Sequence, residues 1–192
     1  MTEQLWAPWR LKYIESAHKA EGCIFCDYPA QGEEQDAESL LVYRGPHAFI
    51  MLNAYPYSNG HLMVVPYRHT SRFTDYTDAE MLDVMHQIRL GIALLTTAFH
   101  PDGFNLGVNM GRVAGAGIAD HLHWHIVPRW NGDTNFMPVL ADVRVIPESL
   151  KSTFERLRAV LPAALEQTCP ENGSHSSAGG LEQTGAANSK RG

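Results

Sequence analysis

Three apolar runs separated by turn residues stand out in the first half of the chain. They lie at 40–45, 47–56 and 60–69, and a turn at Gly45 joins the first two. Short apolar runs with glycine and proline between them are typical of successive strands. The third strand is expected to end near Pro66, because proline cannot donate a hydrogen bond to a neighbouring strand.

A long helix is predicted after Thr77, where the period of the pattern changes. Thr77 and Glu80 form a capping-box pattern, in which each side chain satisfies a backbone N–H of the first turn. The apolar positions that follow recur every three or four residues, as on one face of a helix, and they are Met81, Met85, Ile88, Ile92 and Leu95. The helix is expected to run to about Ala98 and to stop before Pro101.

The second half of the chain adds two strands and a helix. Residues 103–111 predict a strand, a glycine-rich turn follows, and residues 119–130 predict another strand. A final amphipathic helix is marked by Leu150, Phe154, Leu157 and Leu161. The polar, acidic segment 27–39 is typical of a loop.

Together these elements predict an α+β domain with a mainly antiparallel sheet of about five strands. One long central helix and a C-terminal helix are expected to cover one face of this sheet. The 192 residues fit a single domain at 21–166, preceded by an N-terminal arm at 1–20. Residues 167–192 have almost no apolar periodicity and are expected to form a disordered tail.

Charge and composition narrow the functional classes. The formal net charge of −6 argues against broad electrostatic capture of nucleic acid or of an anionic membrane, although a locally positive pocket could still bind a small anion. No apolar stretch approaches the ~20 residues of a membrane span. The N-terminus lacks the basic start and apolar segment of a signal peptide, so a cytoplasmic location is expected.

The segment ADHLHWHIVPRW, residues 119–130, places His121, His123 and His125 at alternate positions. On a strand these side chains share one face, whereas on a helix they would scatter. The row could be a polar strand face, a zinc site built from the three imidazoles, or a nucleophilic or acid–base row. The first interpretation is disfavoured, because each buried imidazole needs its own hydrogen-bond partners.

Small residues lie just before the histidine row. Gly115, Ala116 and Gly117 would let the backbone approach a ligand closely, and their N–H groups could cradle phosphate oxygens. Asn109 precedes this segment, and Arg129 follows the histidines. Taken together, the segment predicts a pocket that faces a phosphate.

The cysteines suggest a second site. Cys23 and Cys26 form a C-x-x-C pair, and Cys169 lies in the expected tail. Three cysteines do not make a disulfide framework, and in a reducing compartment such a pair is typical of a metal knuckle or a redox pair. Two buried thiols without either role remain the alternative.

At this point the sequence resembles a known family. NMGRVAGAGIADHLHWHIVPR resembles the motif of the histidine-triad (HIT) superfamily of nucleotide hydrolases and transferases. NAYPYSNGHLMVVPYRH, residues 53–69, resembles the strand pair that lines the nucleotide site in that family. The similarity covers roughly residues 20–130. LWAPWRLKY, GFNLGVNMG and HIVPRWNGDTNF are most similar to its bacterial diadenosine tetraphosphate (AP4A) phosphorylase branch.

The resemblance implies a HIT-like fold and a role for each site residue. His123 would be the nucleophile, His125 would contact the phosphate or bridging oxygens, and His121 would complete the triad. The implied substrate-binding residues are Asn53, His61, Asn109, Gly115, Ala116, Gly117 and Arg129. The resemblance also implies a two-fold homodimer, paired through the long helix and a neighbouring strand.

In zinc-bearing relatives, the two remaining ligands match His69 and His121. The resemblance therefore implies a structural Zn²⁺ held by Cys23, Cys26, His69 and His121, with no part in the chemistry.

The leading functional expectation is a nucleotidyltransferase. Many family members carry a glutamine before the first histidine that helps to activate water, but here the segment is one residue longer and reads Gly115-Ala116-Gly117. This departure favours inorganic phosphate as the acceptor, so that diadenosine tetraphosphate gives ADP and ATP through a nucleotidyl-histidine. The alternatives are a hydrolase of dinucleoside polyphosphates or nucleoside phosphoramidates, a nucleotide-binding regulatory module with weak turnover, and a zinc hydrolase built on the triad.

Overall fold

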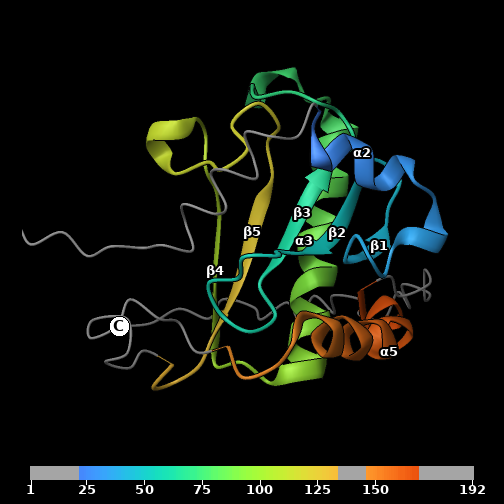
Figure 1. Ribbon diagram of the computed structural model, residues 1–192, viewed down its shortest axis with the longest axis vertical. Helices are drawn as coiled ribbons and strands as arrows, with labels where there is room; N and C mark the ends of the chain where they lie inside the picture. The colour runs from blue at the N-terminus through green and yellow to red at the C-terminus, as the bar shows by residue number, and fades with distance from the viewer. Residues whose placement is uncertain (1–21, 134–145, 169–192) are drawn as a thin grey trace, which may run out of the picture.

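The structure, a computed structural model, describes residues 22–133 and 146–168 (Figure 1). Five strands form one sheet in the order β1-β2-β3-β5-β4, and every neighbouring pair is antiparallel. The strands are β1 (Leu41–Arg44), β2 (Ala48–Leu52), β3 (Leu62–Pro66), β4 (Gly103–Val108) and β5 (Trp124–Arg129). The helices are α2 (Ile24–Ala30), α3 (Asp78–Phe99) and α5 (Leu150–Thr168), with 3-10 turns η1 (Glu33–Gln35), η2 (Phe73–Asp75) and η3 (Arg112–Ala114). The predicted α+β class and antiparallel sheet are confirmed.

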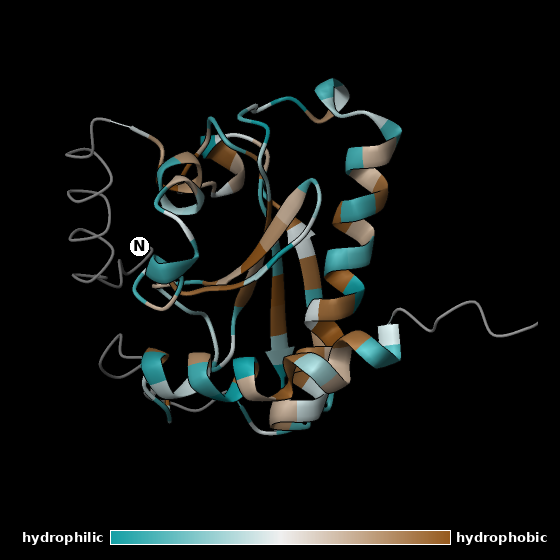
Figure 2. Cartoon of the chain, turned by 90° about the vertical axis from the view of Figure 1, so that its right-hand side faces the viewer, coloured by the Kyte–Doolittle hydropathy of each residue, from teal (hydrophilic) through white to brown (hydrophobic). Residues whose placement is uncertain are grey.

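The main core lies between the sheet and α3. Alternate residues of β2, Ile50 and Leu52, point to this side and are fully buried, as are Leu94 and Leu95 of α3. α5 packs across α3 and β1 at one end of the sheet (Figures 1 and 2). α3 begins and ends within one residue of the predicted bounds. The capping box at Thr77 marks its start, and Pro101 follows its end.

The prediction that helices cover only one face of the sheet is wrong. α2 packs on the face opposite α3, where Phe25 joins a second buried cluster with Phe49, Met51 and Met63 (Figure 2). The acidic segment 27–39 is therefore partly helical rather than a loop. A helix this short is marginal in isolation, and it is the burial of Phe25, at 1% exposure, that anchors it.

The buried stripe of α3 also differs from the predicted one. Met85 is 45% exposed, whereas Asp83 and Gln87 are buried on the inner side of the helix. The Asp83 carboxylate accepts hydrogen bonds from the backbone N–H groups of His47 and Ala48, at 2.8 and 2.9 Å, and so ties the β1–β2 turn to α3. Polar residues with such partners are stable in a core, and hydropathy does not reveal them.

The predicted histidine strand is shorter than expected, because β5 begins only at Trp124. Its pairing with β3 and β4 starts there, and His121 and His123 precede it. At the other end of the domain, α5 continues through Thr168, two residues past the expected start of the tail. The expected arm at 1–20 and the rest of the tail lie outside the described residues.

Within residues 22–133 and 146–168, no helix combines the length and the apolar character needed to cross a bilayer.

The cap of α3 gives a stability prediction. The Thr77 hydroxyl accepts from the Glu80 N–H at 3.3 Å, and the Glu80 carboxylate accepts from the Thr77 N–H at 2.8 Å. Thr77→Ala removes the first bond and the bond that the same hydroxyl donates to Oε2 of Glu80 at 2.9 Å, and it is expected to lower the free energy of unfolding by about 1 kcal/mol in urea denaturation. The exposed Thr74 is the control, and Thr74→Ala should change the free energy of unfolding by less than about 0.5 kcal/mol. Equal effects of the two substitutions would contradict the capping role.

Candidate functional site

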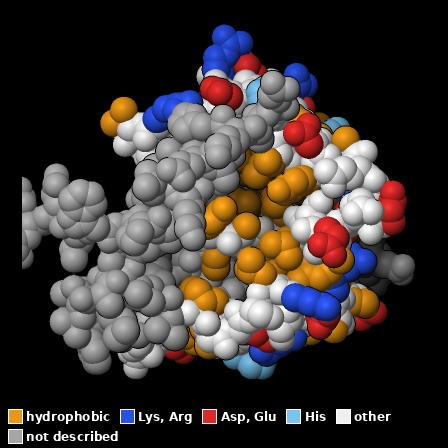
Figure 3. All heavy atoms as spheres, viewed as in Figure 1, with side chains coloured by type: hydrophobic (Ala, Val, Ile, Leu, Met, Phe, Trp, Pro, Cys, Tyr) orange, Lys and Arg blue, Asp and Glu red, His pale blue; other side chains and the backbone are white. Residues whose placement is uncertain are grey.

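The histidines lie on the α2 face of the sheet. Leu122, Trp124 and Ile126 point into the core beneath α3. His123 and His125 alternate with them and so face the other side, with their ring centroids 4.9 Å apart. Figure 3 looks onto this face, where apolar side chains gather around a hollow near its centre.

The two ring nitrogens of His123 differ in their hydrogen bonding. Its Nδ1 lies 2.9 Å from the carbonyl oxygen of His121, so Nδ1–H donates and Nε2 carries the free lone pair. The ring is 4% exposed and packs against Phe25, with centroids 4.8 Å apart. Burial lowers the pKa of His123, although the bond to the His121 carbonyl partly opposes this shift. The neutral ring therefore carries its available lone pair on Nε2, in a buried position.

A chain of hydrogen bonds orients His125. The Tyr57 N–H lies 3.1 Å from Nδ1 of His61, so this nitrogen is an acceptor, and a neutral His61 carries its proton on Nε2. That Nε2 lies 3.0 Å from Nδ1 of His125 and donates to it. The proton of a neutral His125 is consequently on Nε2. Burial, with a smaller contribution from His123, lowers the pKa of His125 to about 4, which keeps the ring neutral at physiological pH.

His61 itself is fully buried. Besides Tyr57 and His125, it has Nδ2 of Asn53 at 3.4 Å from its Nδ1. Asn53 in turn accepts from the Tyr55 N–H at 2.9 Å. The structure thus brings the predicted residues Asn53 and His61 to the histidine row, and it places His61 behind His125.

His121 faces away from His125, toward the cysteine pair. Its Nδ1 lies 3.3 Å from Sγ of Cys23 and 3.6 Å from Sγ of Cys26, while its Nε2 lies 2.8 Å from the carbonyl oxygen of Pro66. Burial lowers the pKa of His121 to about 4, so the ring is neutral. A neutral ring that donates from Nε2 presents the Nδ1 lone pair to the thiols.

Four side chains that could hold a metal ion meet at this position. The ligand atoms of Cys23, Cys26, His69 and His121 all lie within 4.8 Å of one another, and Sγ of Cys26 is 3.4 Å from Nδ1 of His69. Typical zinc bond lengths place a sulfur and a nitrogen ligand about 3.5 Å apart, which these distances match. Burial, followed by the effect of Cys23, raises the pKa of Cys26 to about 11, which is opposite to the lowered pKa of a reactive redox thiol.

The three triad imidazoles do not converge on one point. Nδ1 of His121 faces the thiols, Nδ1 of His123 is bonded to a backbone carbonyl, and Nδ1 of His125 is bonded to His61. In the described part of the chain, the one group of histidine, cysteine and acidic residues close enough to share a metal is the Cys23 cluster. A zinc hydrolase built on the triad therefore has no support in the geometry.

The glycine-rich segment is arranged differently from the predicted phosphate cradle. The N–H groups of Gly115 and Ala116 donate to the carbonyls of Arg112 and Gly111, at 3.0 and 3.3 Å, and are committed to the turn. Gly115 has a φ of +95°, so a side chain there would strain the backbone. Gly117 is exposed.

The two predicted residues that flank this segment, Asn109 and Arg129, differ in how close they lie to the site. A Cβ on Gly115 would lie 3.9 Å from Nδ2 of Asn109, so Asn109 borders the turn. Arg129 follows the triad at the end of β5. Its Nε donates to Oδ2 of Asp133 at 2.6 Å, and its Nη1 donates to Oδ1 of Asn105 at 2.9 Å. The structure therefore does not bring Arg129 to the imidazoles.

Two functional contacts were not predicted. Phe25 covers the rings of His121 and His123, and the Tyr57 N–H fixes the tautomer of His61. The apolar residue inside the C-x-x-C pair was an available signal for Phe25. No sequence signal marks the Tyr57 contact, because a backbone N–H makes it.

Comparisons with known proteins agree with this geometry. A family model described as the HIT domain matches residues 34–132. AP-4-A phosphorylase of Mycobacterium tuberculosis is 40% identical over 156 residues, which cover 79% of this chain and 80% of the relative.

Two solved structures have the same fold. A zinc-bound histidine triad family protein from Mycobacterium smegmatis has a TM-score of 0.57 and 28% identity, and the match covers 74% of this chain and 94% of that one. A hypothetical histidine triad nucleotide-binding protein from Sulfolobus tokodaii has a TM-score of 0.59 and 26% identity, over 80% and 98% of the two chains. With the histidine row, the antiparallel sheet and the family match in agreement, the chain belongs to the HIT domain family.

Proposed function

We propose that this protein is a nucleotidyltransferase that cleaves diadenosine tetraphosphate with inorganic phosphate to give ADP and ATP. The observation that carries the proposal is the state of His123, a buried neutral imidazole whose Nδ1–H is held by the His121 carbonyl and whose Nε2 carries the lone pair. The 40% identity to the mycobacterial AP-4-A phosphorylase supports the choice of substrate.

In the first step, Nε2 of His123 attacks the α-phosphorus of the dinucleotide. A phosphorus–nitrogen bond forms, the bond to the bridging oxygen breaks, and ATP leaves from an adenylyl-histidine. One difficult displacement thereby becomes two easier ones. The Nδ1–H bond to the His121 carbonyl stabilises the positive charge that the ring gains.

His125 assists at the leaving group. Its neutral ring carries a proton on Nε2, because Nδ1 accepts from His61. This N–H can donate to the bridging oxygen as negative charge develops there. His61 is a positioning residue in this scheme, since it is fully buried and acts through His125.

In the second step, an oxygen of inorganic phosphate attacks the adenylyl phosphorus. The phosphorus–nitrogen bond breaks, ADP is released and Nε2 of His123 regains its lone pair. Phosphate is favoured over water because Gly115-Ala116-Gly117 stands where many relatives carry a water-activating glutamine. Asn109, which borders this turn, is proposed to contact the transferred phosphate, and Asn53 to contact the ribose.

We further propose that Cys23, Cys26, His69 and His121 hold a structural zinc ion. The donor set and its distances fit tetrahedral zinc, and the bond from Nε2 of His121 to the Pro66 carbonyl fixes the tautomer that a ligand needs. The bound ion would cross-link α2 to the segment that enters β5 and would take no part in the transfer.

We also propose a homodimer formed through α3 and β4. Leu82 and Met85 on α3 are 58% and 45% exposed, and Leu106 on the edge strand β4 is 51% exposed. Within residues 22–133 and 146–168, β4 pairs with β5 alone, so its other edge could extend the sheet into a second copy, and the exposed apolar side chains favour such pairing.

His123→Ala tests the covalent mechanism. The substitution removes the nucleophile and should lower kcat by at least about 10³-fold, measured by chromatography of ADP and ATP. Mass spectrometry of the parent enzyme, quenched at high pH, should show an adenylyl adduct on His123. His47→Ala, at an exposed histidine, is the control and should leave kcat unchanged. Full activity of the His123 variant would exclude the mechanism.

The acceptor can be identified from the products. In H₂¹⁸O with inorganic phosphate present, we expect ADP and ATP without incorporated ¹⁸O, and turnover should rise with phosphate concentration. Cleavage at full rate without phosphate, with ¹⁸O in a released AMP, would instead identify a hydrolase. Tight nucleotide binding without turnover under either condition would identify a binding module.

Metal analysis tests the zinc proposal. Elemental analysis of the purified protein should give about one zinc per chain, and Cys26→Ala should lose it and unfold at a lower temperature. Cys169→Ala is the matched control and should keep the metal. A metal-free parent protein with a cooperative thermal transition would rule the site out.

A further inference from the structure

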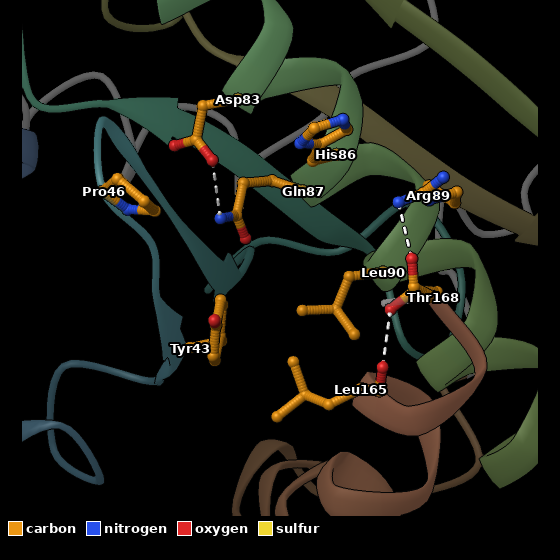
Figure 4. A pocket seen from close by; sticks show the side chains of 9 residues that line it. All are labelled: Tyr43, Pro46, Asp83, His86, Gln87, Arg89, Leu90, Leu165 and Thr168. Carbon is orange, nitrogen blue, oxygen red and sulfur yellow. Dashed lines mark hydrogen bonds between the residues drawn. The ribbon is translucent and has the colours of Figure 1, made fainter. Parts of the chain in front are cut away.

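A cavity lies on the α3 side of the sheet, away from the imidazoles (Figure 4). It has a volume of about 210 Å³ and is enclosed by the β1–β2 hairpin, α3 and the end of α5. Leu90 and Leu165 form an apolar wall, and Asp83 and Gln87 form a polar end. None of these residues takes part in the proposed nucleotide chemistry.

Gln87 places an unpaired acceptor inside this cavity. The side chain is 4% exposed, and its Nε2 donates to Oδ1 of Asp83 at 3.3 Å. That bond sets the orientation of the amide, so Oε1 is turned to the other side. Within the described residues, Oε1 has no hydrogen-bond partner, and Figure 4 shows it directed into the cavity between Tyr43 and Leu90.

Asp83, Arg89 and Thr168, which line the same cavity, are hydrogen-bonded to other groups, and His86 also lines it. Oδ2 of Asp83 accepts from the N–H groups of His47 and Ala48. At the rim, Nη2 of Arg89 donates to the carbonyl of Thr168 at 2.5 Å, and the Thr168 hydroxyl donates to the Ala164 carbonyl at 2.9 Å. What the cavity offers a ligand is therefore an acceptor at its polar end and an apolar wall beside it.

We propose that this cavity binds a small molecule that carries an N–H or O–H donor on a compact apolar or aromatic body. The donor would bond to Oε1 of Gln87, a buried carbonyl that is costly to leave unpaired, and the body would lie against Leu90 and Leu165. The volume is below the range of about 300–1,000 Å³ typical of drug-sized ligands, which limits the ligand to a few heavy atoms beyond one ring.

Three probes of one size test this proposal on the full chain. Phenol and aniline each carry a donor on a benzene ring, and toluene has the same shape without a donor. Phenol and aniline are expected to shift the NMR signals of the Leu90 and Leu165 methyl groups and of the Gln87 side-chain amide. Toluene should bind about tenfold more weakly, the effect of one neutral hydrogen bond.

Two substitutions locate the site. Gln87→Met keeps the length of the side chain without the acceptor and should remove the preference for phenol over toluene. Leu165→Phe fills the cavity from α5 and should abolish the binding of both phenol and toluene. This variant tests the proposal by itself if the Gln87 variant does not fold. Thr96→Ser, at an exposed position on α3, is the control and should bind as the parent does.

Equal affinity for phenol and toluene, or unchanged phenol binding in folded Gln87→Met or Leu165→Phe protein, would overturn the proposal. Because the cavity is separate from the histidine row, Gln87→Met is expected to retain the cleavage of diadenosine tetraphosphate. Loss of cleavage in the His123 variant and loss of phenol binding in the Gln87 variant are therefore independent results.

Discussion

An extended backbone directs successive side chains to opposite faces, and the site depends on how this constraint acts between Leu122 and Ile126. Leu122, Trp124 and Ile126 are buried beneath α3, where their apolar side chains fix the strand against the core. His123 and His125 are then obliged to face the other side. The same packing that stabilises the fold therefore directs both imidazoles to one face of the sheet.

His121 links the two parts of this face. Its side chain points to Cys23 and Cys26, while its backbone carbonyl accepts from Nδ1 of His123. The residue that belongs to the candidate metal cluster thus also determines the tautomer of the neighbouring ring. His61 does the same for His125 from behind, so each of the two rings is oriented by a buried partner that is itself fixed by the backbone.

The sequence was sufficient for the elements with a clear period, and it failed where long-range packing decides. The five strands and α3 follow from alternation, helical spacing and the capping box at Thr77. α2 was missed because seven residues are too few to show a helical period and the segment that follows is polar, and the burial of Phe25 against the sheet explains the helix. The burial of Asp83 and Gln87 was missed because both residues are polar. Asp83 is satisfied by the backbone of a distant turn, and Gln87 donates to Asp83. Within the site, the alternate spacing predicted a shared face for the histidines but not their separate hydrogen-bond partners.

The small size of α2 has a consequence for the behaviour of the molecule in solution. Seven residues make too few internal bonds to persist alone, so the segment depends on the docking of Phe25, beside the proposed metal site at its first turn. Transient undocking would hydrate the ring of His123, and the low dielectric that suppresses its protonation would be lost. Amide exchange of α2 and the proton affinity of His123 should therefore vary in concert, as two readouts of one local opening equilibrium.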